Sequence, residues 1–294
     1  MTERVTVRVP ATSANLGPGF DCLGIAVGLF LEVSATLSSE NRLIYEGEGS
    51  VPDTPDNLIH RGFRAVYAAL GEGAPCVRLE AHNPIPLARG LGSSSAALVA
   101  GAALADAVTG GRLGRDGVFQ LTADIEGHPD NVAPAVYGGF TVSARAGERY
   151  LGQMLPIPDD WRFSFAVPDF ELLTSEARAA LPTSYVRADA IYNASRTALW
   201  TAAVALNKPE LLRVAAQDAL HEPYREPLVP GLAACRKRLL EAGASAAFLS
   251  GAGPTLAAIS VGTVTQEVKE EMRTFVRGGK VLELEPSGGY TVEQ

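Results

Sequence analysis

The sequence is short of cysteines, of long apolar runs and of positive charge. Its three cysteines, Cys22, Cys76 and Cys235, are odd in number and far apart. This spacing predicts neither a disulfide framework nor a zinc knuckle. No uninterrupted apolar run reaches the ~18 residues that a membrane-spanning helix needs. The first residues lack a basic segment followed by an apolar one, so we expect no signal peptide and a cytoplasmic location.

Basic side chains are outnumbered by acidic ones. The 294 residues include 25 Lys and Arg against 33 Asp and Glu, for a net charge of −8. This balance argues against nucleic acid or an anionic membrane as a partner. Any phosphate must therefore be bound by a local positive site. An apolar content of 47% and a charged content of 20% are ordinary for a folded protein, and the length allows two domains.

One stretch, residues 86–97, combines two glycines, three serines and an alanine-rich run. Gly90 and Gly92 allow a tight loop, and one of the serines is placed to cap the following helix. A glycine-rich loop before a helix N-terminus is a typical phosphate site. It is not a Walker A loop, because no lysine follows Gly92. Nor is it a dinucleotide fingerprint, because Ser95 stands where the third glycine belongs.

The hydrophobic pattern predicts a mixture of strands and helices. Strands are expected at residues 2–9, 29–37, 77–81, 140–144, 161–167, 245–249, 255–260 and 280–285. Helices are expected at 57–70, 96–105, 117–125, 174–181, 187–206, 209–220, 231–242 and 263–275, with Asp56 and Asp116 as N-caps of two of them. Residues 10–21 are predicted to be a wide turn. The pattern weakens near 147–158, which predicts two domains, 1–154 and 155–294.

Polar side chains gather in three places. Glu126, His128, Asp130 and Asn131 form the densest polar cluster of the chain. Helix capping would explain Asp130 and Asn131, but it explains Glu126 and His128 less well. Asn15 and Asp21 flank a Gly-Pro-Gly turn, and residues 250–254 form a second glycine-rich turn. Together these segments favour a functional site over a purely structural role.

Three motifs, at residues 10–21, 90–97 and 250–255, resemble the superfamily of galactokinase, homoserine kinase, mevalonate kinase and phosphomevalonate kinase, the GHMP kinases. Residues 126–134 and 222–225 are similar to those of the homoserine kinases within it. The resemblance implies an α+β fold, with an N-terminal ribosomal-protein-S5-domain-2-like domain followed by a ferredoxin-like domain. It further implies phosphorylation of L-homoserine to O-phospho-L-homoserine in threonine biosynthesis, with ATP and Mg²⁺ as cofactors and a homodimer as the assembly.

The resemblance assigns the donor half of the site. The residues expected to cradle the triphosphate are Pro86, Leu87, Ala88, Arg89, Gly90, Leu91, Gly92, Ser93, Ser94, Ser95 and Ala96. Asn57 is expected beside the adenine, although the start of a helix would also explain this residue. Ser94 and Glu126 are expected to hold Mg²⁺, which agrees with the preference of this ion for oxygen ligands.

The acceptor half follows from the same resemblance. Asp21 and Asn15 would bind the ammonium group of L-homoserine, and Arg178 and Arg225 its carboxylate. The γ-phosphate is an alternative partner of Arg178. Further expected substrate contacts are His128, Thr174 and Gly251. Asn131 is expected to orient the hydroxyl, while Asp130 either acts as the base, as in mevalonate kinase, or has no such role.

Other functions remain open at this stage. The same fold could phosphorylate another alcohol, such as mevalonate, but an acid without an ammonium group would not need both Asp21 and two arginines. A nucleotide-binding regulator without kinase activity would be expected to lack Glu126 or the serine loop, and both are present. A nicotinamide-dependent oxidoreductase is excluded by the missing third glycine.

Overall fold

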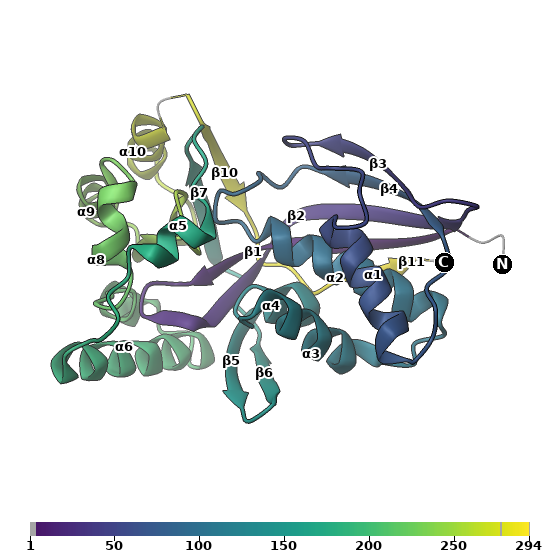
Figure 1. Cartoon of the computed structure of the whole chain (residues 1–294). Coiled ribbons are helices and arrows are strands. Elements are labelled where there is room, and N and C mark those ends of the chain that lie inside the picture. The colour runs from purple at the N-terminus through teal and green to yellow at the C-terminus, as the bar shows by residue number, and fades with distance from the viewer. Residues whose placement is uncertain (1–3, 277, 294) are drawn as a thin grey trace.

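The computed structural model describes residues 4–276 and 278–293, which form two β-sheets with helices packed against them (Figure 1). The first sheet contains β1 (Val5–Asn15), β2 (Gly19–Leu37), β3 (Arg42–Gly47), β4 (Val77–Asn83), β5 (Phe140–Ala146), β6 (Arg149–Leu155) and β11 (Thr291–Glu293). Its strand order is β11-β1-β2-β4-β3, and β5 pairs with β2 and β6. The second sheet contains β7 (Trp161–Val167), β8 (Ala246–Leu249), β9 (Leu256–Val261) and β10 (Lys280–Leu284), in the order β10-β7-β9-β8.

The helices of the N-terminal half are packed closely because their contact residues are small. These helices are α1 (Leu58–Ala69), α2 (Ser93–Val108), α3 (Gly114–Glu126) and α4 (Val132–Tyr137). Gly62 and Gly101 lie where α1 meets α2, and a Cβ atom at Gly101 would overlap the carbonyl oxygen of Ile59. The alanine-rich α2 is therefore buried along most of its length. This burial fixes the position of its N-terminus, where the glycine-rich loop ends.

The C-terminal half has the strand order of a ferredoxin-like fold. Its helices are α5 (Thr174–Ala179), α6 (Arg187–Ala205), α7 (Leu212–Ala215), α8 (Glu222–Arg225), α9 (Leu232–Glu241) and α10 (Gln266–Val276), with 3-10 turns η1 (Pro209–Leu211) and η2 (Glu226–Leu228). Helices connect β7 to β8 and β9 to β10, and the pairings in this sheet are all antiparallel. This is the β-α-β-β-α-β arrangement, so the predicted α+β class with a ferredoxin-like second part is confirmed.

Two features of the topology bear on the division into domains. Leu155 ends β6 opposite Phe140 in the first sheet, and the second sheet begins at β7. The last strand, β11, returns to pair with β1. We propose that the division lies between β6 and β7. We also propose that β11 belongs with the N-terminal part, although the predicted range 155–294 placed it in the C-terminal domain.

The predicted wide turn at residues 10–21 is wrong. β1 continues to Asn15 and β2 starts at Gly19, so only a short turn separates the two strands. The chain reverses there because Asn15, Leu16 and Asp21 adopt left-handed backbone conformations, with φ of 68°, 50° and 55°. The β1–β2 hairpin therefore extends beyond the first sheet toward α6 (Figure 1). It carries Asn15 and Asp21 to the C-terminal half.

The predicted helix caps are also corrected. The N-cap of α1 is Asn57, whose Oδ1 accepts the backbone N–H of Ile59, rather than Asp56. Asp116 lies within the first turn of α3, where its carboxylate accepts the hydroxyl of Tyr137. Gly92 occupies the N-cap position of α2 with φ of 68°, so no serine side chain caps this helix. The three serine hydroxyls remain available for other partners.

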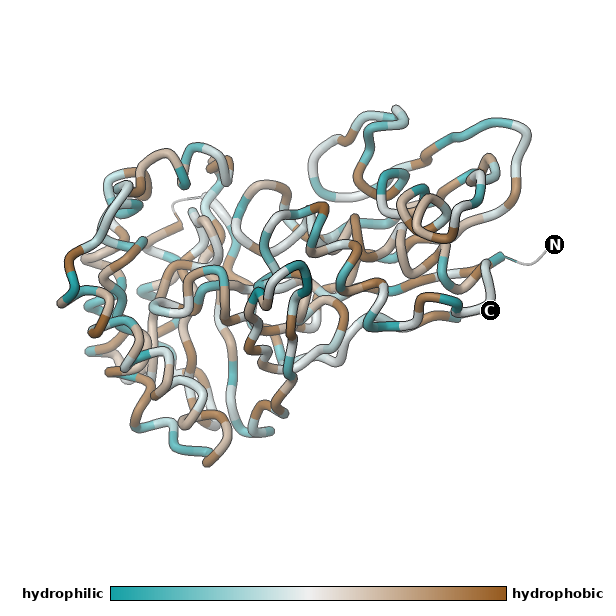
Figure 2. Tube along the Cα trace, turned by 60° about the horizontal axis from the view of Figure 1, so that its bottom comes forward, coloured by the Kyte–Doolittle hydropathy of each residue, from teal (hydrophilic) through white to brown (hydrophobic). Residues whose placement is uncertain are grey.

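Apolar side chains join the two halves. Phe140 of β5 stacks on Trp200 of α6 with ring centroids 5.9 Å apart, and Trp200 contacts Phe248 of β8 edge-on at 5.9 Å. The hydropathy trace accordingly alternates between apolar and polar residues along the packed elements (Figure 2). Among the described residues, none of the helices is both long and apolar enough to span a bilayer.

Candidate active site

A cavity of about 220 Å³ lies between the two halves of the chain. From the N-terminal half it is lined by the β1–β2 hairpin, the glycine-rich loop and the segment after α3; from the C-terminal half it is lined by α5, α8 and the turn at residues 251–253. The predicted site residues that line it are Asn15, Asp21, Ala88, Arg89, Gly90, Leu91, Gly92, Ser93, Ser94, Glu126, His128, Asp130, Asn131, Thr174, Arg178, Arg225 and Gly251. The fold thus brings together segments that are far apart in the sequence.

A second cavity of about 250 Å³ adjoins the first and shares Ala88, Ser93 and Ser94 with it. Asn57 and Leu87 line this second cavity. The side chain of Asn57 caps α1 and also donates to the carbonyl of Pro52, so it is held in the wall. The remaining predicted residues, Pro86, Ser95 and Ala96, line neither cavity.

The glycine-rich loop is held by hydrogen bonds from both halves of the chain. The carbonyl of Leu91 accepts the N–H of Thr12 at 3.1 Å, and the carbonyl of Gly90 accepts the hydroxyl of Ser250 at 2.6 Å. Gly90 has φ of 77°, and a Cβ atom there would overlap the carbonyl of Ser250. The loop therefore needs glycine at this position both for its conformation and for its close contact.

The side chain of Arg89 is directed at the protein backbone. Its guanidinium donates to the carbonyls of Leu87, Pro168 and Asp169 at 2.8 to 3.1 Å. It also lies 3.5 Å from Glu171. These bonds tie the loop to the segment before α5, so the guanidinium supports the loop rather than lying open in the cavity.

Glu126, the last residue of α3, faces the start of α2. Its Oε1 accepts the hydroxyls of Ser94 at 2.7 Å and Ser95 at 2.9 Å. Hydroxyl and carboxylate oxygens beside a helix N-terminus suit Mg²⁺ together with substrate phosphates. The Oε2 atom accepts no hydrogen bond from the described residues. Ser94 and Glu126 therefore fit the metal site expected from the sequence, and Ser95 is a supporting residue.

Asp21 and Arg178 form a bidentate ion pair across the cavity. Arg178 Nη2 lies 2.6 Å from Oδ1 of Asp21, and Nη1 lies 3.1 Å from Oδ2. Asn15 supports this pair by accepting the N–H of Asp21 and donating to the carbonyl of Gly251. Burial opposes the charge of Arg178, but the hydrogen bonds and negative charge of Asp21 outweigh it and raise its pKa. Arg178 is therefore a cation in this arrangement.

Arg225 is a buried cation, with a relative exposure of 1%. It donates to the carbonyls of Ala177 and Gly251 and to Nδ1 of His221, at 3.1 to 3.3 Å. No carboxylate of residues 4–276 or 278–293 forms an ion pair with it. Burial, together with the charge of Arg178, lowers its pKa to about 10. A buried guanidinium without a counter-ion is costly, and an anion would stabilise it, so Arg225 is a candidate anion-binding residue.

His128, Asp130 and Asn131 form a hydrogen-bonded group after α3. His128 Nδ1 lies 2.6 Å from Oδ1 of Asp130, which also accepts the N–H of Asn131 at 2.9 Å. Burial opposes protonation of His128, but the contact with Asp130 outweighs it and raises the pKa of the imidazole. Asn131 Oδ1 accepts the hydroxyl of Thr12, so its NH₂ group is left for the cavity.

Sequence reasoning missed three residues that shape this site: Thr12, Phe20 and His221. The guanidiniums of Arg178 and Arg225 lie 5.4 and 5.2 Å from the ring centre of Phe20, and this ring also stacks on His221. His221 accepts from Arg225 through Nδ1, so it is neutral and donates through Nε2 to the carbonyl of Gly17 at 2.6 Å. Its position four residues before Arg225 was the available signal, since residues at this spacing meet on a helix.

Comparison with known proteins identifies the family to which the chain belongs. A family model described as GHMP kinases N terminal domain matches residues 57–139, and one described as GHMP kinases C terminal matches residues 202–277. A homoserine kinase from Thermus thermophilus is 57% identical over 284 residues, which cover 96% of each protein. The chain belongs to the homoserine kinases of the GHMP kinase family.

Further homoserine kinases agree with this membership. That of Moorella thermoacetica is 45% identical over 95% of this chain and 96% of its own. The crystal structure of the homoserine kinase from Cytophaga hutchinsonii superposes with a TM-score of 0.89 at 28% identity, covering 100% of this chain and 98% of that one. Mevalonate diphosphate decarboxylase from Staphylococcus aureus, at 15% identity and a TM-score of 0.75, shares the fold.

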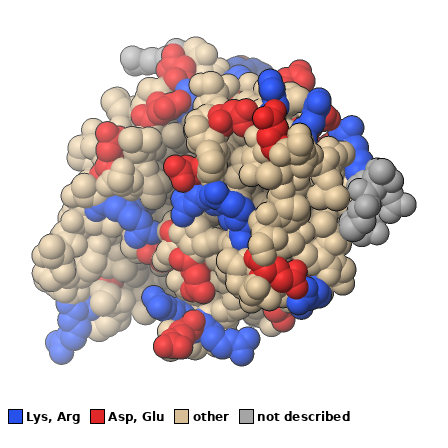
Figure 3. Space-filling model, turned by 45° about the vertical axis from the view of Figure 1, so that its right-hand side comes forward, with Lys and Arg blue, Asp and Glu red and all other residues tan. Residues whose placement is uncertain are grey.

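The acidic and basic side chains of this homoserine kinase are interspersed on the face shown in Figure 3. The face has no large area of one sign. A phosphate therefore meets no extended positive area on this face.

Proposed function

We infer that the protein transfers the γ-phosphoryl group of ATP to the hydroxyl of L-homoserine, giving O-phospho-L-homoserine. The observation that carries this inference is the acceptor cavity itself. Among the groups that line it, the carboxylate of Asp21 and the guanidiniums of Arg178 and Arg225 are proposed to face the acceptor. A zwitterionic amino acid complements these charges, whereas a hydroxy acid without an ammonium group does not. The 57% identity with the Thermus thermophilus enzyme supports the same substrate.

ATP is proposed to bind across the two adjoining cavities. The cavity beside Asn57 would receive the adenine, and the loop at residues 86–96 would hold the triphosphate through its N–H groups. Ser94 and Glu126 would hold Mg²⁺, which neutralises charge on the phosphates when bound. Within this proposal Arg89 supports the loop, and Ser95 supports the metal ligand Glu126.

Homoserine is proposed to exchange partners with the Asp21–Arg178 ion pair. Its ammonium group would bind Asp21 and Asn15, and its carboxylate would bind Arg225 and Arg178. Asp21 then meets the positive ammonium group of the substrate, and Arg178 meets its negative carboxylate. Thr174, His128 and Gly251 would complete the acceptor pocket.

The acceptor hydroxyl is proposed to be oriented by the NH₂ group of Asn131. Asp130 is 2% exposed, and its Oδ1 is engaged by His128 and by a backbone N–H. Because phosphoryl transfer has a loose transition state, positioning and charge neutralisation can supply most of the rate. We therefore propose that Asp130 holds His128 and is not the general base.

Asp130→Asn should consequently retain kcat within about tenfold of the parent enzyme, because asparagine still accepts hydrogen bonds from His128 and the backbone. General acid–base catalysis contributes typically 10²–10⁴-fold. A loss of that size in a coupled assay, with a pH dependence that disappears in the variant, would make Asp130 the base. Asn131→Ala is the companion variant and should lower kcat more than Asp130→Asn does.

A coupled ATP assay with homoserine, mevalonate and galactose tests the function itself. We expect turnover of homoserine alone, and 4-hydroxybutanoate, which lacks the ammonium group, should be a poor substrate. Absence of homoserine turnover would refute the assignment. Calorimetry that detects ATP binding without any phosphorylated product would instead support the non-catalytic regulator.

We further propose that the enzyme works in the cytoplasm, where ATP is available, in the biosynthesis of threonine. We also propose that the protein forms the homodimer that the family resemblance implies, which sedimentation analysis can test.

A further inference from the structure

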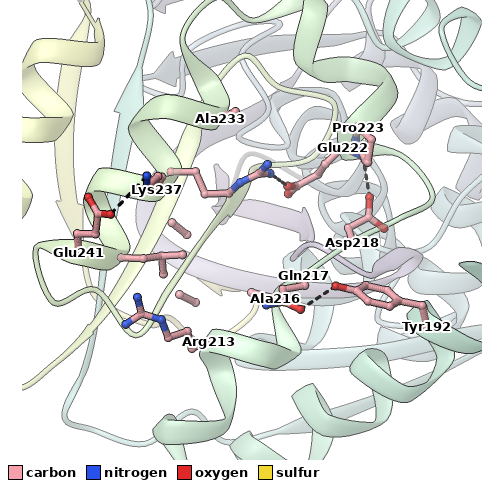
Figure 4. A pocket seen from close by; sticks show the side chains of 14 residues that line it. Tyr192, Arg213, Ala216, Gln217, Asp218, Glu222, Pro223, Ala233, Lys237 and Glu241 are labelled. Carbon is pink, nitrogen blue, oxygen red and sulfur yellow. Dashed lines mark hydrogen bonds and ion pairs between the residues drawn. The ribbon is translucent and has the colours of Figure 1, made fainter.

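A larger cavity, of about 540 Å³, lies on the other side of α8 from the acceptor site. We call it the rear cavity; its wall includes Arg213, Asp218, Glu222, Arg236, Lys237 and Leu240 (Figure 4). Glu222, at the start of α8, faces the rear cavity, whereas Arg225, at its end, lines the acceptor cavity. A volume of this size is typical of sites for small organic ligands.

The two buried carboxylates of the rear cavity are already satisfied, whereas the third, Glu241, is 59% exposed and lies 3.8 Å from Lys237. Asp218 accepts the backbone N–H groups of residues 220–222 and the amide of Asn193, at 2.7 to 3.0 Å. Glu222, 2% exposed, accepts the N–H of Leu249 at 2.6 Å and forms an ion pair with Arg236. Burial raises the pKa of Glu222 to about 7 despite the nearby Arg236. Neither group has much capacity left for a cationic ligand.

Two cations of the rear cavity, in contrast, are available. Arg213 forms no hydrogen bond or ion pair with any residue in the described ranges 4–276 and 278–293. Within the part of the chain that the structure describes, the one ion pair of Lys237 is with Glu241, at 3.8 Å, and the two side chains are 77% and 59% exposed. Figure 4 shows Arg213 and Lys237 on one side of the cavity, with Asp218 and Glu222 opposite. Alanine and leucine side chains line the space between them.

The wall between the two cavities is linked by hydrogen bonds to Arg225, the arginine proposed to bind the substrate. Asp218 fixes the start of α8, and His221 accepts from Arg225 at 3.1 Å. Glu222 also holds the N–H of Leu249, next to the turn whose Gly251 carbonyl accepts from Arg225 and Asn15. Arg236 lines the same cavity, so an anion held by Arg213 and Lys237 would also attract Arg236 and draw it away from the buried carboxylate of Glu222, which would then lack its cation. Such a charge is costly, so α8 and Arg225 would shift.

We propose that the rear cavity is a binding site for a small organic anion with an apolar body, and that its occupation weakens homoserine binding through α8. Arg213 and Lys237, whose ion pair with Glu241 is long and exposed, select the negative charge, and the alanine and leucine side chains accept the apolar part. This site is additional to the phosphotransfer reaction. Its occupation should raise the KM for homoserine while leaving kcat nearly unchanged.

The test uses 4-methylpentanoate as the anionic probe and 4-methylpentan-1-ol as its neutral isostere, with the full chain. Calorimetry should detect binding of the acid and not of the alcohol. Steady-state kinetics should show an increase of about fivefold in the KM for homoserine, as expected for coupled sites. Both effects should be lost in the double variant Arg213→Gln/Lys237→Gln, whose activity without the probe stays normal. Both should also be lost in Ala233→Met, which fills the cavity without changing its charge.

The matched control is Arg273→Gln, which removes an exposed arginine of α10 outside the cavity and should respond as the parent does. Absence of binding at millimolar concentrations would overturn the proposal. So would a KM effect that persists in the double variant, because the acid would then compete at the acceptor site. The calorimetric result does not depend on turnover, so it can be distinguished from a failure of the proposed kinase function.

Discussion

Arg225→Gln raises the KM for homoserine by about 10²-fold or more, because loss of one partner of a buried charge pair costs about 2–5 kcal/mol. Arg225 is 1% exposed and has no counter-ion among the described residues, so the substrate carboxylate would be its first one. The change should be much smaller for the KM of ATP. Steady-state kinetics with each substrate varied in turn measures both values.

Two further variants make this result specific. Arg225→Lys keeps the charge but loses the planar fork that binds a carboxylate through two bonds, so it should restore only part of the affinity. Arg187→Gln, at the exposed start of α6, removes one positive charge away from the cavity and should behave as the parent enzyme. An unchanged KM in Arg225→Gln would remove Arg225 from the acceptor site.

Glu126→Gln lowers kcat by about 10²–10³-fold and raises the Mg²⁺ concentration needed for half-maximal activity. A bound metal ion stabilises the transition state by several kcal/mol, and each 1.36 kcal/mol is tenfold in rate. The amide still accepts the hydroxyls of Ser94 and Ser95, so the local structure should persist. Titration of activity with Mg²⁺ at saturating ATP measures the shift.

Asp124→Asn is the matched control, since Asp124 is an exposed carboxylate on the same helix, two residues before Glu126. Its Mg²⁺ dependence should match that of the parent. Ser94→Ala should shift the Mg²⁺ requirement in the same direction as Glu126→Gln but by less, because a hydroxyl is a weaker ligand than a carboxylate. If neither variant altered the requirement, the proposed metal ligands would be wrong.

The local pattern predicted the elements well where the periodicity was clear. The helix predicted at residues 187–206 is α6, Arg187–Ala205, and the strand predicted at 161–167 is β7. The prediction of a turn over residues 10–21 failed because β1 runs to Asn15 and β2 starts at Gly19. The left-handed conformations of Asn15, Leu16 and Asp21, which allow so short a connection, are not revealed by residue type alone. β3, β6 and β11 were missed, since their partners in the sheet, rather than their own pattern, stabilise them.

Sequence and structure therefore determined different parts of this protein. The glycine-rich loop without a lysine, the polar cluster at residues 126–131 and the family motifs identified a phosphate-binding kinase and nearly all of the residues that line its cavity. Only the tertiary structure decided what those side chains face. It paired Arg178 with Asp21, turned Arg89 to the backbone and left Arg225 buried without a counter-ion. It also placed the rear cavity behind α8. The physical reason is that residue type fixes what bonds a group can form, whereas long-range packing fixes which partner it meets.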